Sequence, residues 1–178
     1  TAKHVEMNSW VNLKKECVKA LREWKAANPT KALDNLDFWM TGECWDHGVY
    51  KDDYYTSGAF DSMINFSTQG GGLIAKGKVA GIYDSFASQI NSDPTFNVLS
   101  YVSSHDSVIA TGDKIHLGSA FLLLPGGIQI YYGDETDRTV DSTAQSNGQH
   151  NLRSDMNWSS MNETTLAHWQ TVGQFRNN

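Results

Sequence analysis

The chain has 178 residues, of which 39% are hydrophobic and 11% aromatic, and its formal net charge at pH 7 is −6. This length fits one domain with a packed core and is too short for two domains of ordinary size. The negative charge argues against nucleic acid or an anionic membrane as the main partner, and no apolar run approaches the roughly 20 residues that span a bilayer.

The first predicted element is a helix, because apolar residues recur at helical spacing from Trp10 to Trp24 until Asn28-Pro29 interrupts the pattern. A short apolar run over residues 38–40 follows and leads into Thr41-Gly42-Glu43. The two cysteines, Cys17 and Cys44, fit neither a metal site nor a disulfide framework. Free thiols are the favoured interpretation, and one bridge stays possible if the protein is exported.

Strands and helices alternate along the rest of the chain. In order, the sequence predicts a strand over 63–66, a helix over 79–90, a strand over 98–102, a helix over 114–123, a strand over 128–132 and a helix over 166–176. Short apolar strands that alternate with helices are typical of a parallel sheet covered by helices. An open doubly wound sheet and a closed barrel both produce this pattern.

The positions of polar residues favour the barrel. Glu43, His105-Asp106 and Asp134-Glu135 each follow the carboxyl end of a different predicted strand, which is where a (β/α)₈ barrel builds its active face. A complete barrel needs about 250 residues. We therefore expect residues 1–178 to form one partial (β/α)₈ barrel domain, cut at both ends, with a long loop over 133–152 and a structural role for Asp134-Glu135.

Glu43 and Asp106 are the candidate catalytic carboxylates. Glu43 is flanked by aromatic residues, and an apolar setting favours the neutral carboxyl group that a general acid needs. Carboxylates that face each other across a sugar-sized cleft are the requirement for glycosidic bond cleavage. A catalytic metal site is the alternative for His105 and the aspartates, but it needs three or more converging ligands, and the sequence shows no such cluster.

Five ordered motifs resemble those of glycoside hydrolase family 13, the α-amylase family. The stretches that carry the resemblance are Thr1-Ala2-Lys3-His4, 38–43 with Glu43, 101–106 with His105-Asp106, 125–135, and Arg153-Ser-Asp-Met-Asn-Trp158. The similarity is greatest to periplasmic α-amylases of enteric bacteria. It implies that the chain is the C-terminal half of an α/β (β/α)₈ TIM barrel, about strands 5 to 8 with their helices.

The resemblance also implies roles for individual residues. Glu43 would protonate the leaving glycosidic oxygen and then deprotonate water, and Asp106 would hold sugar hydroxyls and stabilise the oxocarbenium-like transition state. His105 would donate to a hydroxyl of the same sugar. The other substrate-binding residues that we expect are Lys3 and His4 on the leaving-group side, Trp45, His47 and Arg153.

Further expectations concern what lies around these residues. The nucleophilic aspartate of the family would directly precede Thr1, so the isolated chain is expected to be inactive. The backbone carbonyl of His4 would ligate a structural calcium ion whose other ligands lie upstream. The substrate would be an α-glucan or maltooligosaccharide, and the location periplasmic or secreted. An α-glucosidase, a glucan transglycosylase and a non-catalytic carbohydrate-binding relative remain as alternatives.

Overall fold

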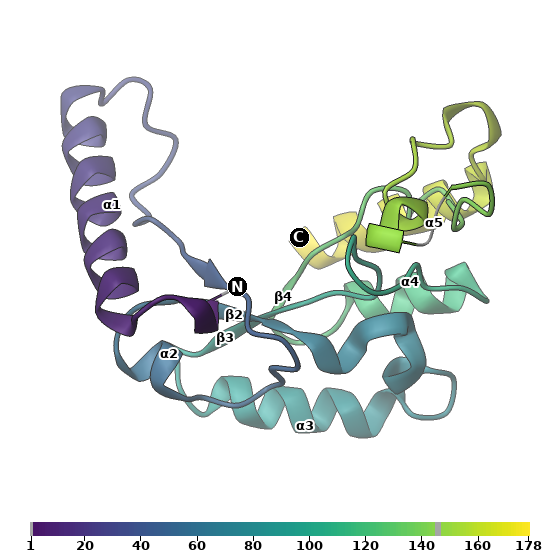
Figure 1. The fold of residues 1–178 in the computed structure, drawn as a ribbon, viewed down its shortest axis with the longest axis horizontal. Coiled ribbons are helices and arrows are strands. Elements are labelled where there is room, and N and C mark those ends of the chain that lie inside the picture. Colours follow the sequence, from purple (N-terminus) through teal and green to yellow (C-terminus); the bar gives the residue numbers. More distant parts are fainter. Residues whose placement is uncertain (1, 145–146) are drawn as a thin grey trace.

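The computed structural model describes residues 2–144 and 147–178. A parallel four-stranded sheet forms its centre, and neighbouring strands follow the chain order, as Figure 1 shows: β1 (Thr41–Gly42), β2 (Ser62–Asn65), β3 (Asn97–Ser100) and β4 (Gly127–Ile128). Because parallel crossovers are right-handed, a sheet whose order never reverses keeps its crossover helices on one face. A doubly wound sheet reverses its order and carries helices on both faces. The observed order is therefore that of a barrel segment.

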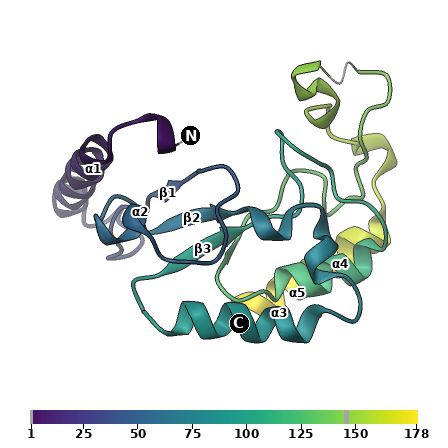
Figure 2. The same cartoon turned by 60° about the horizontal axis from the view of Figure 1, so that its bottom comes forward.

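The four predicted helices are confirmed. They are α1 (Met7–Ala27), α3 (Val79–Asn91), α4 (Lys114–Leu122) and α5 (Glu163–Asn177), and α3, α4 and α5 lie on the same side of the sheet (Figure 2). Side-chain caps explain two of their starts, since the Asp113 carboxylate accepts from the amides of Ile115 and His116, and Asn162 accepts from the amide of Thr165. Shorter elements complete the described chain: η1 (Ala2–His4), α2 (Asp53–Thr56), η2 (Phe66–Ile74), η3 (Asn147–Leu152) and η4 (Trp158–Ser160).

The core lies between the sheet and these helices. Met63 on β2, Val98 on β3 and Phe121 on α4 are completely buried. Trp169 of α5 packs against Phe121 and donates its indole N–H to the Lys114 carbonyl over 2.9 Å. This contact fixes the last helix against α4, so α5 closes the layer that covers β3 and β4.

Two predicted strands differ from the observed ones. Residues 38–40 lie outside β1, although the Met40 carbonyl accepts from the Asp61 amide over 2.8 Å, and β4 contains only Gly127–Ile128 of the region predicted to extend to residue 132. Both strands lie at an edge of the sheet, and an apolar run forms ladder pairs only beside a neighbouring strand. Trp39 and Ile130 are accordingly 54% and 46% exposed, as expected for apolar faces that are only partly covered.

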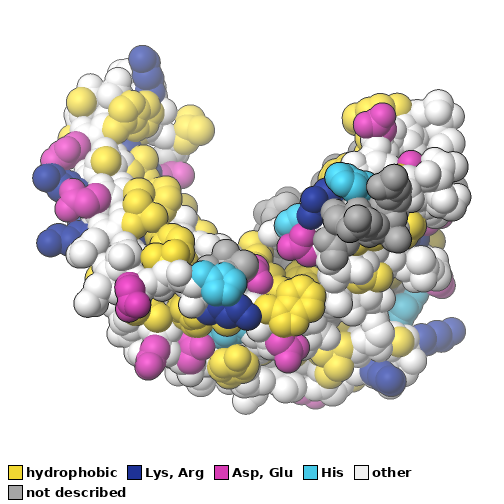
Figure 3. Space-filling model, in the orientation of Figure 1, with side chains coloured by type: hydrophobic (Ala, Val, Ile, Leu, Met, Phe, Trp, Pro, Cys, Tyr) yellow, Lys and Arg dark blue, Asp and Glu magenta, His cyan; other side chains and the backbone are white. Residues whose placement is uncertain are grey.

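Helix α1 projects to one side of the sheet and contacts it near its first turns, where Trp10 packs on Phe60 and Lys14 Nζ lies 2.6 Å from Asp61 Oδ1. Figure 3 shows a hollow between α1 and the loops after β4, with apolar side chains along the flank of α1 that faces it. Leu13 and Trp24 are among the exposed apolar residues of this helix. None of the described helices has the length and apolar character needed to cross a membrane.

Candidate active site

A pocket of about 200 Å³ opens at the carboxyl ends of the strands. It brings together residues that follow β1, β2, β3 and β4. Its lining consists of Glu43, Ile64, Phe66, Tyr101, Ser104, His105, Asp106 and Gln129. The three residues predicted to carry the chemistry, Glu43, His105 and Asp106, therefore converge on one pocket, as the order of strands and helices led us to expect.

Glu43 directly follows β1 and is half-buried. Gly42 before it packs tightly against β2, because an added Cβ would lie 2.6 Å from the sulfur of Met63. The carbonyl of Glu43 accepts a hydrogen bond from the amide of Ala2, and the Trp10 indole donates to the Ala2 carbonyl over 3.0 Å. The backbone that carries Glu43 is thus fixed on one side by the sheet and on the other by η1.

His105 and Asp106 project from the loop after β3. The Ser104 amide donates to the Val108 carbonyl over 2.9 Å, and the Asp106 amide donates to the Ser104 hydroxyl over 3.3 Å. The side chains of His105 and Asp106 are 59% and 52% exposed, with 3.3 Å between His105 Nε2 and Asp106 Oδ2. A ligand in the pocket can therefore reach both side chains.

Arg153 contacts this same loop from a distant part of the sequence. Its Nη2 donates to Asp106 Oδ1 over 3.0 Å, and its Nε donates to the His105 carbonyl over 3.1 Å. The sequence suggested that Arg153 would bind the sugar directly. The structure places the guanidinium on the Asp106 carboxylate, where it compensates the negative charge of a candidate catalytic group.

Below this loop lies a buried polar group that joins the ends of β3 and β4. The Ser103 hydroxyl donates to the Asp134 carboxylate and accepts from the Ala110 amide, and Lys114 Nζ lies 3.6 Å from Asp134 Oδ1. Burial raises the pKa of Asp134, while the Ser103 hydrogen bond and the Lys114 charge oppose that shift. Asp134 thus has the structural position that we expected at the barrel end.

The floor of the pocket is aromatic. Tyr101 is only 2% exposed and donates its hydroxyl to the Gln69 side-chain oxygen over 2.7 Å. Burial raises the pKa of the Tyr101 hydroxyl above its ordinary value. Phe66 packs between Tyr101 and the exposed Trp45, whose ring centroid lies 5.1 Å from that of Phe66. Trp45 therefore lies beside a residue that lines the pocket, and its predicted role in substrate binding stays a prediction.

His47 is not brought to the pocket. Its side chain is 1% exposed, its Nδ1 lies 2.8 Å from the Gly48 carbonyl, and its Nε2 lies 3.2 Å from Asp52. Its ring stacks on that of Tyr50 with 4.2 Å between centroids. Because both nitrogens are engaged and the ring is covered, His47 supports the loop between β1 and β2. The prediction that it binds substrate is corrected accordingly.

Lys3 and His4 lie in η1 and are exposed. The Ala2 hydrogen bond brings η1 beside the end of β1 that carries Glu43, but neither Lys3 nor His4 lines the pocket itself. Thr1, where the motif match begins, lies outside the described residues. The substrate-binding roles of Lys3 and His4 stay predictions.

The described residues do not form a metal cage. Over 2–144 and 147–178, no group of three or more histidine, cysteine, aspartate or glutamate side chains is placed to hold a metal ion. Calcium prefers six to eight oxygen ligands, of which this chain would offer the His4 carbonyl. The residues present therefore do not fit a calcium site by themselves, and no catalytic step is assigned to a metal.

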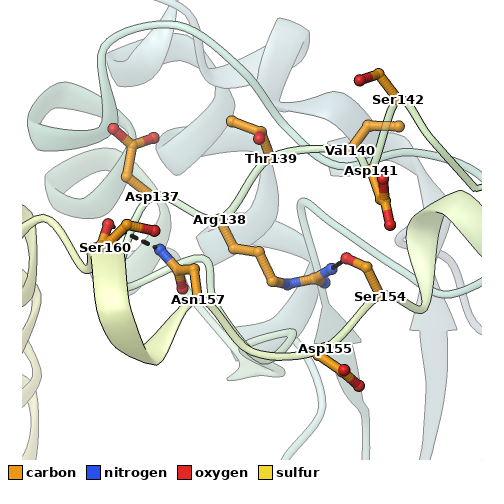
Figure 4. Close-up of a pocket in the computed structure, with 10 residues that line it drawn as sticks. All are labelled: Asp137, Arg138, Thr139, Val140, Asp141, Ser142, Ser154, Asp155, Asn157 and Ser160. Carbon is orange, nitrogen blue, oxygen red and sulfur yellow. Dashed lines mark hydrogen bonds between the residues drawn. The ribbon is translucent and has the colours of Figure 1, made fainter.

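A second, larger pocket of about 440 Å³ lies in the loops after β4. Figure 4 shows the residues that line it, with the Arg138 side chain extending from the segment 137–142 toward Ser154. Asp137 in this wall has a positive φ of 63°, a conformation that aspartate tolerates better than most residues. Arg138 had no motif or spacing that marked it in the sequence.

The chain is similar in sequence to a known α-amylase. It is 48% identical over 181 residues to the periplasmic α-amylase of Escherichia coli (strain K12), and the match covers 99% of this chain and 26% of that protein. No protein-family model matches the chain. The chain thus spans about a quarter of the length of the curated relative it matches.

Solved structures share its fold. One is the cyclic α-maltosyl-(1→6)-maltose hydrolase of Arthrobacter globiformis, with a TM-score of 0.60, 19% identity, and coverage of 97% of this chain and 38% of that chain. Another is a cyclomaltodextrinase, with a TM-score of 0.59, 20% identity, and coverage of 99% and 29%. These likenesses support the α/β barrel segment. The 48% sequence identity over nearly the whole chain makes it similar to a periplasmic α-amylase, and the solved structures add evidence for the fold alone.

Proposed function

We propose that this chain provides the acid/base residue and the transition-state-stabilising carboxylate of an α-amylase-type glycoside hydrolase. The bonds cleaved would be α-1,4-glucosidic bonds in starch, glycogen or maltodextrins. The observation that carries the proposal is the convergence of Glu43, His105 and Asp106 on one pocket at the carboxyl ends of parallel strands. The 48% identity to a periplasmic α-amylase supports it.

In the proposed retaining reaction, Glu43 gives its proton to the glycosidic oxygen as the bond to the sugar breaks. The nucleophile would be the aspartate that the family carries directly before the stretch matching Thr1. Glu43, now a carboxylate, then takes a proton from the water that releases the sugar. Asp106 and His105 would bind hydroxyls of the same sugar, and the negative charge of Asp106 would stabilise the oxocarbenium-like transition state.

Two further parts of the proposal rest on similarity alone: the location on the description of the relative, and the calcium ion on the resemblance of the motifs to the family. A periplasmic or secreted location follows from its description as periplasmic. A structural calcium ion, if present, would contact this chain at the His4 carbonyl and take its other ligands from elsewhere. Calcium removal by a chelator should then lower the thermal stability of a complete barrel without acting on Glu43 or Asp106.

A chimera tests the proposal. In it, this chain replaces the matching segment of the E. coli periplasmic α-amylase, and reducing-sugar release from maltoheptaose is measured. Glu43→Gln keeps the shape and removes the proton, so kcat should fall by about 10²- to 10⁴-fold. Asp106→Asn should lower kcat by about 10²- to 10³-fold. Glu23→Gln, an exposed change on α1, is the matched control and should leave kcat unaltered.

The products and the binding of substrate separate the alternatives. An endo-acting hydrolase should release several maltooligosaccharides whose new reducing ends start in the α configuration by NMR. Glucose with maltohexaose as the first products would indicate an α-glucosidase, and chains longer than maltoheptaose would indicate a transglycosylase. Near-normal turnover in the Glu43→Gln chimera would refute the acid/base assignment. An inactive parent chimera that still binds maltoheptaose would favour the non-catalytic carbohydrate-binding alternative.

A further inference from the structure

Arg138 is a buried arginine whose described side-chain hydrogen bonds and ring contacts lie on two segments, 131–132 and 152–154. The residue is 3% exposed. Its Nε donates to the Tyr132 carbonyl over 3.0 Å, its Nη1 donates to the Ser154 hydroxyl over 2.9 Å, and both Nη atoms lie 3.3 Å from the Leu152 carbonyl (Figure 4 shows the bond to Ser154). The guanidinium also lies over the ring of Tyr132, 4.1 Å from its centroid, and 5.2 Å from that of Tyr131.

The two tyrosines hold the same segment. The Tyr131 hydroxyl donates to the Leu152 carbonyl over 3.1 Å, and the Tyr132 hydroxyl donates to the Ser154 carbonyl over 2.7 Å. We call Tyr131, Tyr132 and Arg138 the arginine clamp. The arginine clamp joins the chain just after β4 to residues 152–154, because its hydrogen bonds to that segment all end on Leu152 or Ser154.

The turn after β4 is shaped for this arginine. A Cβ at Gly133 would lie 2.5 Å from Arg138 Cβ and 2.7 Å from Arg138 Nε, and Gly133 has a φ of +90°. A side chain at this position would therefore collide with the arginine, besides straining the backbone. The close packing of Arg138 on Gly133 leaves the guanidinium little freedom to leave the clamp.

Arg153 lies between the two clamped residues. Leu152 and Ser154 fix the backbone on either side of it, and its own guanidinium contacts the Asp106 carboxylate and the His105 carbonyl over 3.0 and 3.1 Å. The Arg153 side chain is 42% exposed, so holding one conformation costs it rotamer entropy. A fixed backbone lowers that cost, because the guanidinium starts from a defined position.

We propose that Arg138 is a positioning residue, which acts through residues 152–154 to hold Arg153 against Asp106. The inference rests on the proposed function, because it assigns Arg138 to the geometry of a catalytic carboxylate. Arg138 itself touches neither His105 nor Asp106 in any described contact. Its effect must therefore pass through Arg153, and this dependence makes the proposal testable.

The conservative change Arg138→Lys tests the clamp. Lysine keeps the positive charge but has no planar fork to stack on Tyr132 while it binds Leu152 and Ser154. Displacement of a remote support by about 1 Å can lower a rate by up to about 10²-fold. In the chimera with the E. coli enzyme, we expect Arg138→Lys to lower kcat/KM for maltoheptaose by about 10- to 100-fold.

A double-mutant cycle separates positioning from general destabilisation. If Arg138 acts through Arg153, the kcat/KM loss caused by Arg138→Lys should disappear when Arg153→Met is already present. Arg176→Lys is the matched control, because Arg176 also donates to three backbone carbonyls, those of Leu122, Leu124 and Gly126. Its effect on kcat/KM should be small and the same with or without Arg153→Met.

Hydrogen exchange gives a readout that needs no activity. The Ser104 amide is bonded to the Val108 carbonyl in the loop that carries Asp106, and Arg138→Lys should speed its exchange, whereas Arg176→Lys should not. Equal loss of kcat/KM in both Arg153 backgrounds, or unchanged exchange at Ser104, would overturn the proposal. An inactive parent chimera would instead count against the proposed hydrolase function, and the exchange measurement would still decide the role of Arg138.

Discussion

Gly118 on α4 is a position where one added methyl group should lower the free energy of unfolding. A Cβ there would lie 2.5 Å from the indole nitrogen of Trp169 and 2.9 Å from two of its carbons. Carbon atoms in van der Waals contact stay about 3.5–4.0 Å apart, so Gly118→Ala must displace the indole. Trp169 is 3% exposed, and its N–H is bonded to the Lys114 carbonyl. The indole therefore has no empty space to enter and would lose this bond.

The expected cost follows from these contacts. Forcing an extra methyl group into a packed core costs about 1–3 kcal/mol, and weakening a buried hydrogen bond adds about 1 kcal/mol. Alanine is the better helix former by about 1 kcal/mol, which offsets part of this loss. We expect Gly118→Ala to lower the free energy of unfolding by about 1–3 kcal/mol.

The assay is urea unfolding of the chimera, followed by circular dichroism. Gly173→Ala is the matched control, because Gly173 lies in the same helix as Trp169 and an added Cβ would meet no atom within 4 Å. It should raise stability by up to about 1 kcal/mol. Trp169→Phe should make Gly118→Ala less damaging, since the smaller ring lacks the indole nitrogen, which is the atom nearest to the added Cβ. Stabilisation by Gly118→Ala equal to that by Gly173→Ala would refute the reasoning.

Two further predictions concern charge and self-association. Because burial raises the folded-state pKa of Asp134, the native protein binds the Asp134 proton more tightly than the unfolded chain does. The stability contributed by the protonated carboxyl group should therefore decrease as pH rises through the folded-state pKa. Urea titrations at several pH values should show this decrease in the free energy of unfolding for the parent and not for Asp134→Asn. The 178-residue chain alone should self-associate, because β1 and β4 are sheet edges beside the exposed Trp39 and Ile130; a clean monomer in size-exclusion chromatography with a cooperative melt would contradict this.

The helices could be predicted from the sequence because each carries a complete local signal. The apolar spacing from Trp10 to Trp24 lies within α1, and that from Val79 to Ile90 lies within α3. Strand limits were less predictable, since pairing depends on a neighbour that a local run does not reveal. Residues 38–40 are as apolar as a strand, but β1 begins only at Thr41, where Ser62 of β2 becomes its partner.

The candidate site could be predicted where its residues lie at strand ends, and could not be predicted where they are placed by contacts across loops. Glu43 and Asp106 converge because parallel strands end on one side of a sheet. His47 follows Glu43 closely in sequence, yet Asp52 and Tyr50 turn it into the loop interior. Arg138 was missed because its partners at Leu152 and Ser154 come from a separate segment, and no spacing in the sequence announces such a contact.

The two candidate catalytic carboxylates depend on different parts of this structure. Asp106 is held by contacts between the loop after β3 and segments after β4, through Ser103 with Asp134 and through Arg153. Glu43 is carried by β1, and its place relative to β3 is set by the register in which Thr41 pairs with Ser62 and Ser62 pairs with Asn97. A change in the loops after β4 should therefore move Asp106 while β1 stays in register. A change that shifts β2 should move Glu43 relative to Asp106, because β2 lies between β1, which carries Glu43, and β3, which precedes the loop with Asp106.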